Sequence, residues 1–140
     1  MQENVAGPGS ATAPVAAAAE GPLLDAERLD VYRVALEFHA LAVALPLGRG
    51  LRELRDQLER ASTSIVLNTA EAAGRRAPAD RARFFAMARG SATECAAILD
   101  IVRARALAPV AVTRRGRSLL VRVVQMLTRL CQRLEALATP

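Results

Sequence analysis

The positions of glycine and proline, the residues that most readily interrupt helices, constrain the fold of this sequence most strongly. Its 140 residues contain eight glycines and seven prolines, crowded before residue 24 and at turns near 46–50, 74–78 and 109. The long stretches between these turns are rich in Ala, Leu and Arg, which favour helices. The sequence therefore predicts an all-α fold with helices over about residues 25–45, 51–73, 78–105 and 113–138.

Short links between the predicted helices are typical of an antiparallel up-down-up-down four-helix bundle. Asp25 is a suitable N-cap for the first helix, and Thr113 for the fourth. We expect residues 25–140 to form one bundle domain. Residues 1–24 contain almost no large apolar side chain and are predicted to be a disordered Ala/Pro/Gly-rich tail.

The segment 61–76 combines small, polar and apolar residues on one helical surface. Asn68 stands where a leucine is expected, and a buried amide needs a partner, so we expect it to bond to a neighbouring helix. Gly74 is predicted to end the helix in the left-handed conformation that glycine adopts freely. No reaction chemistry is visible in this segment.

The short link at residues 74–77 predicts a hairpin between the second and third helices. Counting outwards from the link places residues 61–62 opposite residues 90–91, so small residues meet in a close crossing. Glu71 is expected near Arg81, and Glu94 close to Gln57 and Arg60, as structural partners rather than catalytic carboxylates.

Apolar spacing predicts one core stripe on each of the last two helices. The stripe on the third helix comprises Phe84, Ala88, Ser91, Cys95, Ile98 and Val102. The stripe on the fourth comprises Leu119, Leu120, Val123, Met126, Leu127, Leu130, Cys131, Leu134 and Leu137.

The first helix is apolar on two sides, which predicts contacts between copies of the chain. Three other helices of a small monomer are not expected to cover both sides. The sequence therefore predicts a homo-oligomer whose interface includes Val31, Val34, Phe38, Leu41 and Leu45.

Positive charge is concentrated at the C-terminal end. The net charge of the chain is +5, and residues 101–140 contain eight arginines but only one acid, Glu135. Four of these arginines align within about 40° along the fourth helix, and two more extend the charge around its first turn. These candidate nucleic-acid-binding residues are Arg115, Arg122, Arg129 and Arg133, with Arg114 and Arg117.

The arginines predict binding of RNA or DNA through non-specific electrostatics. The alternative is a structural adaptor or assembly protein whose arginines contact an acidic protein partner without nucleic acid. Isolation of the chain together with one specific protein, and with no nuclease-sensitive material, would favour that alternative.

Catalysis and bound cofactors are not expected. The single histidine, His39, cannot supply the paired Glu-x-x-His motifs of a di-iron bundle. Two cysteines without CxxC spacing favour neither a zinc site nor a disulfide scaffold. With no catalytic residues, metal or cofactor predicted, and no long apolar run, we expect a non-enzymatic cytoplasmic protein without membrane contacts.

The residues from Ser62 to Arg76, followed by Phe84-Phe85 and the segment 90–94, resemble a known family. Its approximate pattern is S-I-x-x-N-I-A-E-G-x-G-R, then F-x-x-x-A-x-G-S-x-x-E, and the segment 29–35 also looks like its L-x-V-Y-x-x-A start. This is the four-helix-bundle family first met as proteins encoded in intervening sequences of bacterial 23S ribosomal RNA genes. The signature falls on Ser64, Ile65, Asn68, Ala70, Glu71, Gly74, Arg75, Gly90, Ser91 and Glu94.

The resemblance implies a homopentameric ring of up-down bundles. The family includes the accessory variability proteins of diversity-generating retroelements, which are basic pentamers that bind nucleic acid and work with a reverse transcriptase. It thus implies an accessory factor of that kind, whose signature residues mark the bundle rather than an active site. The sequence departs from the pattern at Thr69 and Ala72, and its link before Leu51 is shorter than usual.

Overall fold

A computed structural model describes residues 23–140 of the protein. These residues form a short 3-10 helix, η1 (Asp25–Arg28), and four α-helices, namely α1 (Asp30–Val43), α2 (Arg52–Gly74), α3 (Pro78–Ala104) and α4 (Val110–Ala138). The predicted all-α class and the four helices are therefore confirmed for this part of the chain. The predicted tail lies outside the described residues, apart from its last two, Leu23 and Leu24.

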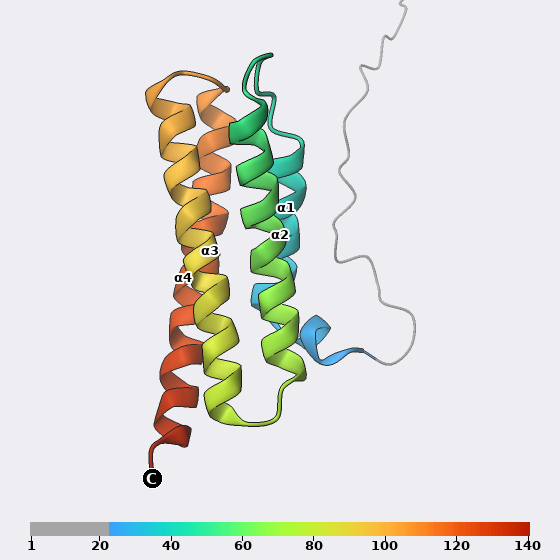
Figure 1. Cartoon of the computed structure of the whole chain (residues 1–140), viewed down its shortest axis with the longest axis vertical. Coiled ribbons are helices and arrows are strands. Elements are labelled where there is room, and N and C mark those ends of the chain that lie inside the picture. The colour runs from blue at the N-terminus through green and yellow to red at the C-terminus, as the bar shows by residue number, and fades with distance from the viewer. Residues whose placement is uncertain (1–22) are drawn as a thin grey trace, which may run out of the picture.

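The four helices lie side by side, and the chain reverses direction at each link (Figure 1). Between α2 and α3, Ser64 Oγ lies 2.8 Å from Ser91 Oγ, and Arg81 Nε donates to the Ala72 carbonyl at 3.3 Å. The middle of α2 thus meets the middle of α3, and the end of α2 meets the start of α3. Contacts between α3 and α4 and between α4 and α1 complete the bundle.

The first helix begins later than predicted. Residues 25–28 form the 3-10 turn η1, in which the Leu24 amide donates to Glu27 Oε2 at 2.6 Å, and α1 starts only at Asp30. Asp25 is therefore not the cap of α1. At the other end, α1 stops at Val43, two residues before the predicted end, because Pro46 disfavours the helical conformation at Leu45, the residue before it.

Two predicted end signals act differently from expectation. Gly74 is the last residue of α2, but among residues 23–140 only Gly50, with φ of 87°, is a glycine in the left-handed region. In α4 the helix starts directly after Pro109, and the Thr113 hydroxyl donates to the Val110 carbonyl at 3.0 Å. Thr113 is therefore an interior residue and not the N-cap.

The residues predicted to contact other copies are covered within one chain, so that prediction is wrong. Val31, Val34, Phe38 and Leu45 are 2%, 5%, 0% and 4% exposed, and Leu41 is half-buried. The reason is length, because α1 has 14 residues and lies between α2 and α4, which have 23 and 29. Two longer helices cover both apolar sides of the short one.

The core otherwise follows the predicted stripes, with a shift at the start of α3. Phe85 is fully buried and Phe84 is only half-buried, the reverse of the prediction, and Ser91 is also half-buried. On α4, six of the nine predicted residues are buried, Met126 and Leu130 are half-buried, and Leu137 is exposed.

Among the glycines of residues 23–140, one is required by close packing, and it lies in α4. A Cβ atom at Gly116 would be 2.9 Å from Leu99 Cδ1, 3.2 Å from Leu41 Cδ2 and 3.5 Å from Phe38 Cε2. By contrast, a Cβ at Gly90 would meet nothing within 4 Å. Small residues do meet between α2 and α3, at Ser64 and Ser91, but Gly90 is not part of that contact, and the tightly packed glycine lies where α4 meets α1 and α3.

Candidate functional site

The four arginines that we call the arginine row, Arg115, Arg122, Arg129 and Arg133, are all exposed on α4. Seven residues separate the first three, which corresponds to about 10.5 Å along the helix, and the whole row extends over about 27 Å. Arg114 and Arg117 are also exposed, near the start of α4. All six predicted nucleic-acid-binding residues thus lie on the surface of one helix.

Few acids within the described residues neutralise this charge. Arg115 pairs with Glu37 of α1, and this exposed ion pair leaves both groups open to solvent. Arg129 Nε donates to the Gln125 carbonyl of its own helix at 3.4 Å. No carboxylate among residues 23–140 lies within 4.0 Å of the basic nitrogens of Arg122, Arg129 or Arg133.

Glu135, the only acid of α4, lies on a different side of the helix from the arginine row. Burial raises the pKa of the Cys131 thiol, Arg89 of α3 lowers it, and Glu135 raises it further. Cys131 faces α3, with its Sγ 3.6 Å from the Ala82 carbonyl oxygen. Glu135 is therefore near the α3 side, whereas the row follows the side on which Arg115 reaches α1.

The C-terminal half of the row extends beyond the cover of α1. At 1.5 Å per residue, α1 is about 21 Å long and α4 about 43 Å. The contacts of Glu37 with Arg115, and of Phe38 and Leu41 with the Gly116 site, place α1 against the first part of α4. Arg129 and Arg133 consequently lie on a part of α4 that a straight α1 is too short to cover.

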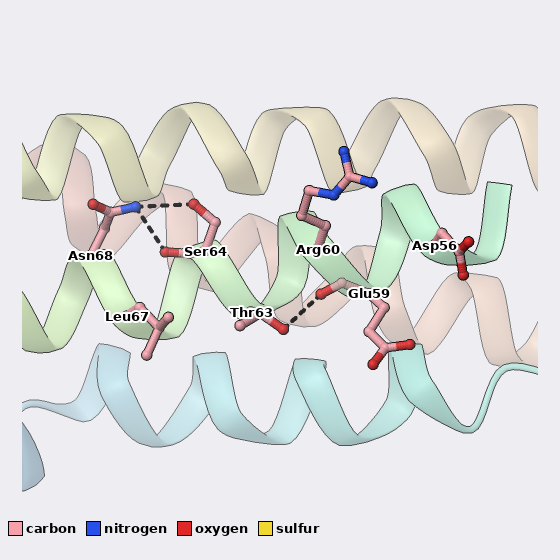
Figure 2. Close-up of a pocket in the computed structure, with 7 residues that line it drawn as sticks. All are labelled: Asp56, Glu59, Arg60, Thr63, Ser64, Leu67 and Asn68. Carbon is pink, nitrogen blue, oxygen red and sulfur yellow. Dashed lines mark hydrogen bonds between the residues drawn. The ribbon is translucent and has the colours of Figure 1, made fainter. Parts of the chain in front are cut away.

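A second surface feature is a shallow groove of about 670 Å³ on the outer side of α2 (Figure 2). All its lining residues belong to that helix, namely Asp56, Glu59, Arg60, Thr63, Ser64, Leu67 and Asn68. The groove combines two acids, one base and small polar groups on an open face. This arrangement suits weak surface contacts better than the enclosure of a small substrate.

Asn68, at the end of this groove, bonds within its own helix. Its Nδ2 donates to the carbonyl oxygen and to the hydroxyl oxygen of Ser64, each at 3.0 Å (Figure 2). Ser64 in turn contacts Ser91 of α3. The predicted bond from Asn68 to a neighbouring helix is therefore wrong, and the link to α3 runs through the Ser64 hydroxyl.

His39 is held in a structural contact with α2. Its Nδ1 lies 2.9 Å from Ser62 Oγ, and the Ser62 hydroxyl donates its only proton to the Glu59 carbonyl at 3.0 Å. Because Ser62 is fully buried, its hydroxyl is not accessible to solvent, and the pair is a contact that joins α1 to α2.

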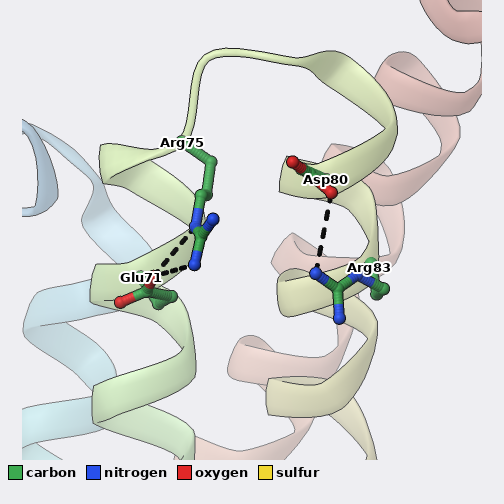
Figure 3. A network of polar contacts seen from close by, with 4 residues as sticks. All are labelled: Glu71, Arg75, Asp80 and Arg83. Carbon is green, nitrogen blue, oxygen red and sulfur yellow. Dashed lines mark hydrogen bonds and ion pairs between the residues drawn. The ribbon is translucent and has the colours of Figure 1, made fainter.

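Two signature residues, Glu71 and Arg75, lie near the tip of the hairpin between α2 and α3, together with Asp80 and Arg83 (Figure 3). Glu71 pairs with Arg75 at 2.6 Å, and Arg83 with Asp80 at 3.6 Å. The guanidinium carbons of Arg75 and Arg83 lie 4.9 Å and 4.5 Å from the centre of the Phe84 ring. These cation-π contacts explain why Phe84 stays partly exposed.

Two predicted glutamate contacts are wrong. Glu71 pairs with Arg75 of its own helix because residues four apart are neighbours on a helix surface, while Arg81 bonds to the Ala72 carbonyl instead. Glu94 is exposed and forms no salt bridge with the described residues. Gly74 and Gly90 are exposed as well, and each has open space where a Cβ would stand.

The two cysteines are buried and unpaired with each other. Burial, with a smaller effect of the Glu94 charge, raises the pKa of Cys95 to about 12, so its thiol is neutral near pH 7. Within residues 23–140, no three His, Cys, Asp or Glu side chains are grouped so that they could hold a metal ion. None of the helices described has the length and apolar character needed to span a membrane.

Comparison with known proteins gives one family. Residues 27–129 match the family model of the 23S rRNA-intervening sequence protein, a range that begins in η1 and includes α1, α2, α3 and most of α4. No curated protein matches the chain. The match extends over well more than half of the sequence and confirms the resemblance seen in its signature residues. This chain belongs to the 23S rRNA-intervening sequence protein family.

Proposed function

We propose that this protein is a non-catalytic helical bundle that binds nucleic acid, RNA or DNA, in the cytoplasm through the arginine row of α4. The observation that supports this proposal is the exposure of Arg122, Arg129 and Arg133 on one side of a helix whose only acid lies near α3. Uncompensated arginines displace counterions from phosphate backbones and so bind polyanions. The guanidinium group also suits bidentate contacts to phosphate oxygens.

Replacement of Arg122, Arg129 and Arg133 by glutamine tests this proposal. Removing three phosphate contacts should flatten the dependence of log affinity on log salt concentration by about 0.9 for each arginine. Fluorescence anisotropy of a labelled nucleic acid, measured over a series of salt concentrations, gives this slope. The variant keeps the Arg115–Glu37 pair and the core, because the three side chains are exposed.

The matched control replaces Arg49, Arg76 and Arg105 by glutamine. These three arginines are exposed in the links between helices, so the control removes the same charge from other places. Equal losses in the two variants would contradict a specific role for the row. Retention of one acidic protein partner, with no nuclease-sensitive material, would instead support the adaptor alternative.

We also propose that the antiparallel up-down-up-down bundles assemble as a homopentameric ring, and that the ring is an accessory factor for a reverse transcriptase, as the family resemblance implies. The apolar residues of α1 are covered within the chain and no longer support this assembly. The outer sides of α2 and α3 expose Leu67, Met87 and Ile101 by 63%, 48% and 44%. These residues are the apolar contact surface that we assign to neighbouring copies.

The ring predicts a native mass of about five chains after nuclease treatment. Leu67→Glu combined with Met87→Glu should lower that mass, because buried carboxylates without partners oppose association. Val43→Glu, at an exposed apolar position of α1, is the control and should leave the mass unchanged. A wild-type protein with the mass of one chain would disprove the ring.

A further inference from the structure

The residues around the arginine row favour one physical form of nucleic acid. The row lies on one side of a single helix, with about 10.5 Å between its first three members. The side chains that flank the row on its outer side are small or polar, such as Ser118 and Gln125, which are both exposed, whereas Met126, on the side toward the core, is half-buried. The row therefore presents a straight line of positive charge along the outer edge of the apolar stripe of α4.

Aromatic side chains are placed away from the row. The chain has four aromatic residues, and none belongs to α4. Phe38 and Phe85 are fully buried, and Phe84 contacts Arg75 and Arg83 at the tip of the hairpin between α2 and α3. Tyr32 is half-buried in α1. Proteins that bind single strands combine a basic surface with aromatic side chains on which bases stack. Helix α4 supplies the basic surface but no aromatic side chain for stacking.

A base-paired duplex has the properties that such a surface can use. Its bases are already stacked inside, and its two strands place a negative charge about every 1.7 Å along the axis. Counterion release per contact is also greater for B-form DNA than for a single strand, about 0.9 against 0.7 in the salt slope. A line of arginines on a straight helix gains most from a stiff, dense line of phosphates.

We propose that the arginine row recognises the phosphate backbone of a nucleic-acid duplex, independently of base sequence, in preference to a single strand. This inference rests on the proposed nucleic-acid binding and specifies its substrate class. RNA and DNA duplexes share the chemistry that is recognised. Arg122, Arg129 and Arg133 carry the preference, because Arg115 is already paired with Glu37.

The test compares a duplex with one of its separated strands of equal length, using the full chain and fluorescence anisotropy. Through three phosphate contacts, duplex affinity should fall by about 40-fold between roughly 50 and 200 mM salt. Single-strand affinity should be weaker and should fall less steeply. Duplexes of DNA, of RNA and of one strand of each are separate arms, and shuffled base sequences should bind equally.

The variants separate failure of this inference from failure of the proposed function. If single strands bind as tightly as duplexes, and glutamine at residues 122, 129 and 133 weakens both, the duplex preference is wrong while nucleic-acid binding by the row stands. If the row variant binds both forms as well as the control with glutamine at residues 49, 76 and 105, both ideas fail. Loss of duplex binding alone in the row variant supports the inference.

Discussion

Phe85→Ala should reduce the free energy of unfolding by about 3–5 kcal/mol. Phe85 is fully buried in the α3 side of the core, so truncation removes its apolar contacts and leaves a cavity. A loss of this size is comparable with the whole stability of many domains, about 5–15 kcal/mol. Urea unfolding followed by circular dichroism at 222 nm, a helical band, measures the change.

The adjacent residue provides the control for this prediction. Phe84→Ala removes the same atoms from a half-buried ring that contacts Arg75 and Arg83. Exposed cation-π contacts contribute about 0.5–1 kcal/mol each, so the expected loss is about 1–2 kcal/mol. Equal losses for the two variants, or a larger loss at Phe84, would contradict the observed orientation of α3.

Gly116→Val should destabilise the bundle by about 3 kcal/mol. Even the first added carbon would lie 2.9 Å from Leu99 Cδ1 and 3.2 Å from Leu41 Cδ2, and valine adds two further methyl groups. Leu99 is buried and belongs to the core cluster, so a shift of its side chain disturbs its neighbours. Chemical unfolding again gives the magnitude.

Gly90→Val is the matched substitution in the interior of α3. Its added Cβ meets no atom within 4 Å, and valine is a slightly better helix former than glycine. We therefore expect little change, or a gain of a few tenths of a kcal/mol. Similar losses at residues 90 and 116 would show that the packing of α4 against α1 and α3 is not as tight as described.

Several helix ends could be predicted closely from sequence, although the starts of α1 and α4 could not. Pro78 begins α3 as expected, and α2 and α4 end within one residue of prediction. The orientation of α3 at its start could not be predicted, since Phe84 and Phe85 are both apolar and differ by 100° around the helix. The contact of Phe84 with Arg75, across the hairpin, decides between them.

Contacts between helices were predicted less well. Residues 61–62 were expected opposite 90–91, but Ser64 meets Ser91 and Ser62 meets His39. This difference is close to one helical turn, because the non-helical link at residues 75–77 sets an offset that counting cannot supply. The packing role of Gly116 was missed for a similar reason. The available signal was a single glycine inside a strongly helical segment. Glycine disfavours a helix, so its presence there can indicate close packing.

In the candidate site too, features that depend on neighbouring residues could be predicted, and contacts between residues far apart in the sequence could not. The alignment of Arg115, Arg122, Arg129 and Arg133 follows from helical spacing, and all four are exposed. The pairing of Arg115 with Glu37 joins residues 78 positions apart and could not be read from spacing. For α1, apolarity on two sides indicated burial correctly but did not indicate which surfaces provide it.

The difference in length between α1 and α4 has a consequence for how charge can vary in this protein. Arg129 and Arg133 lie on the part of α4 that a straight α1 is too short to reach, while the buried side of the same turns contacts α3. Substitutions that change the number or the positions of the arginines on these turns leave the side that packs against α3 unaltered. The positive charge of this surface can thus increase or decrease by one side chain at a time without a change in the stability of the bundle.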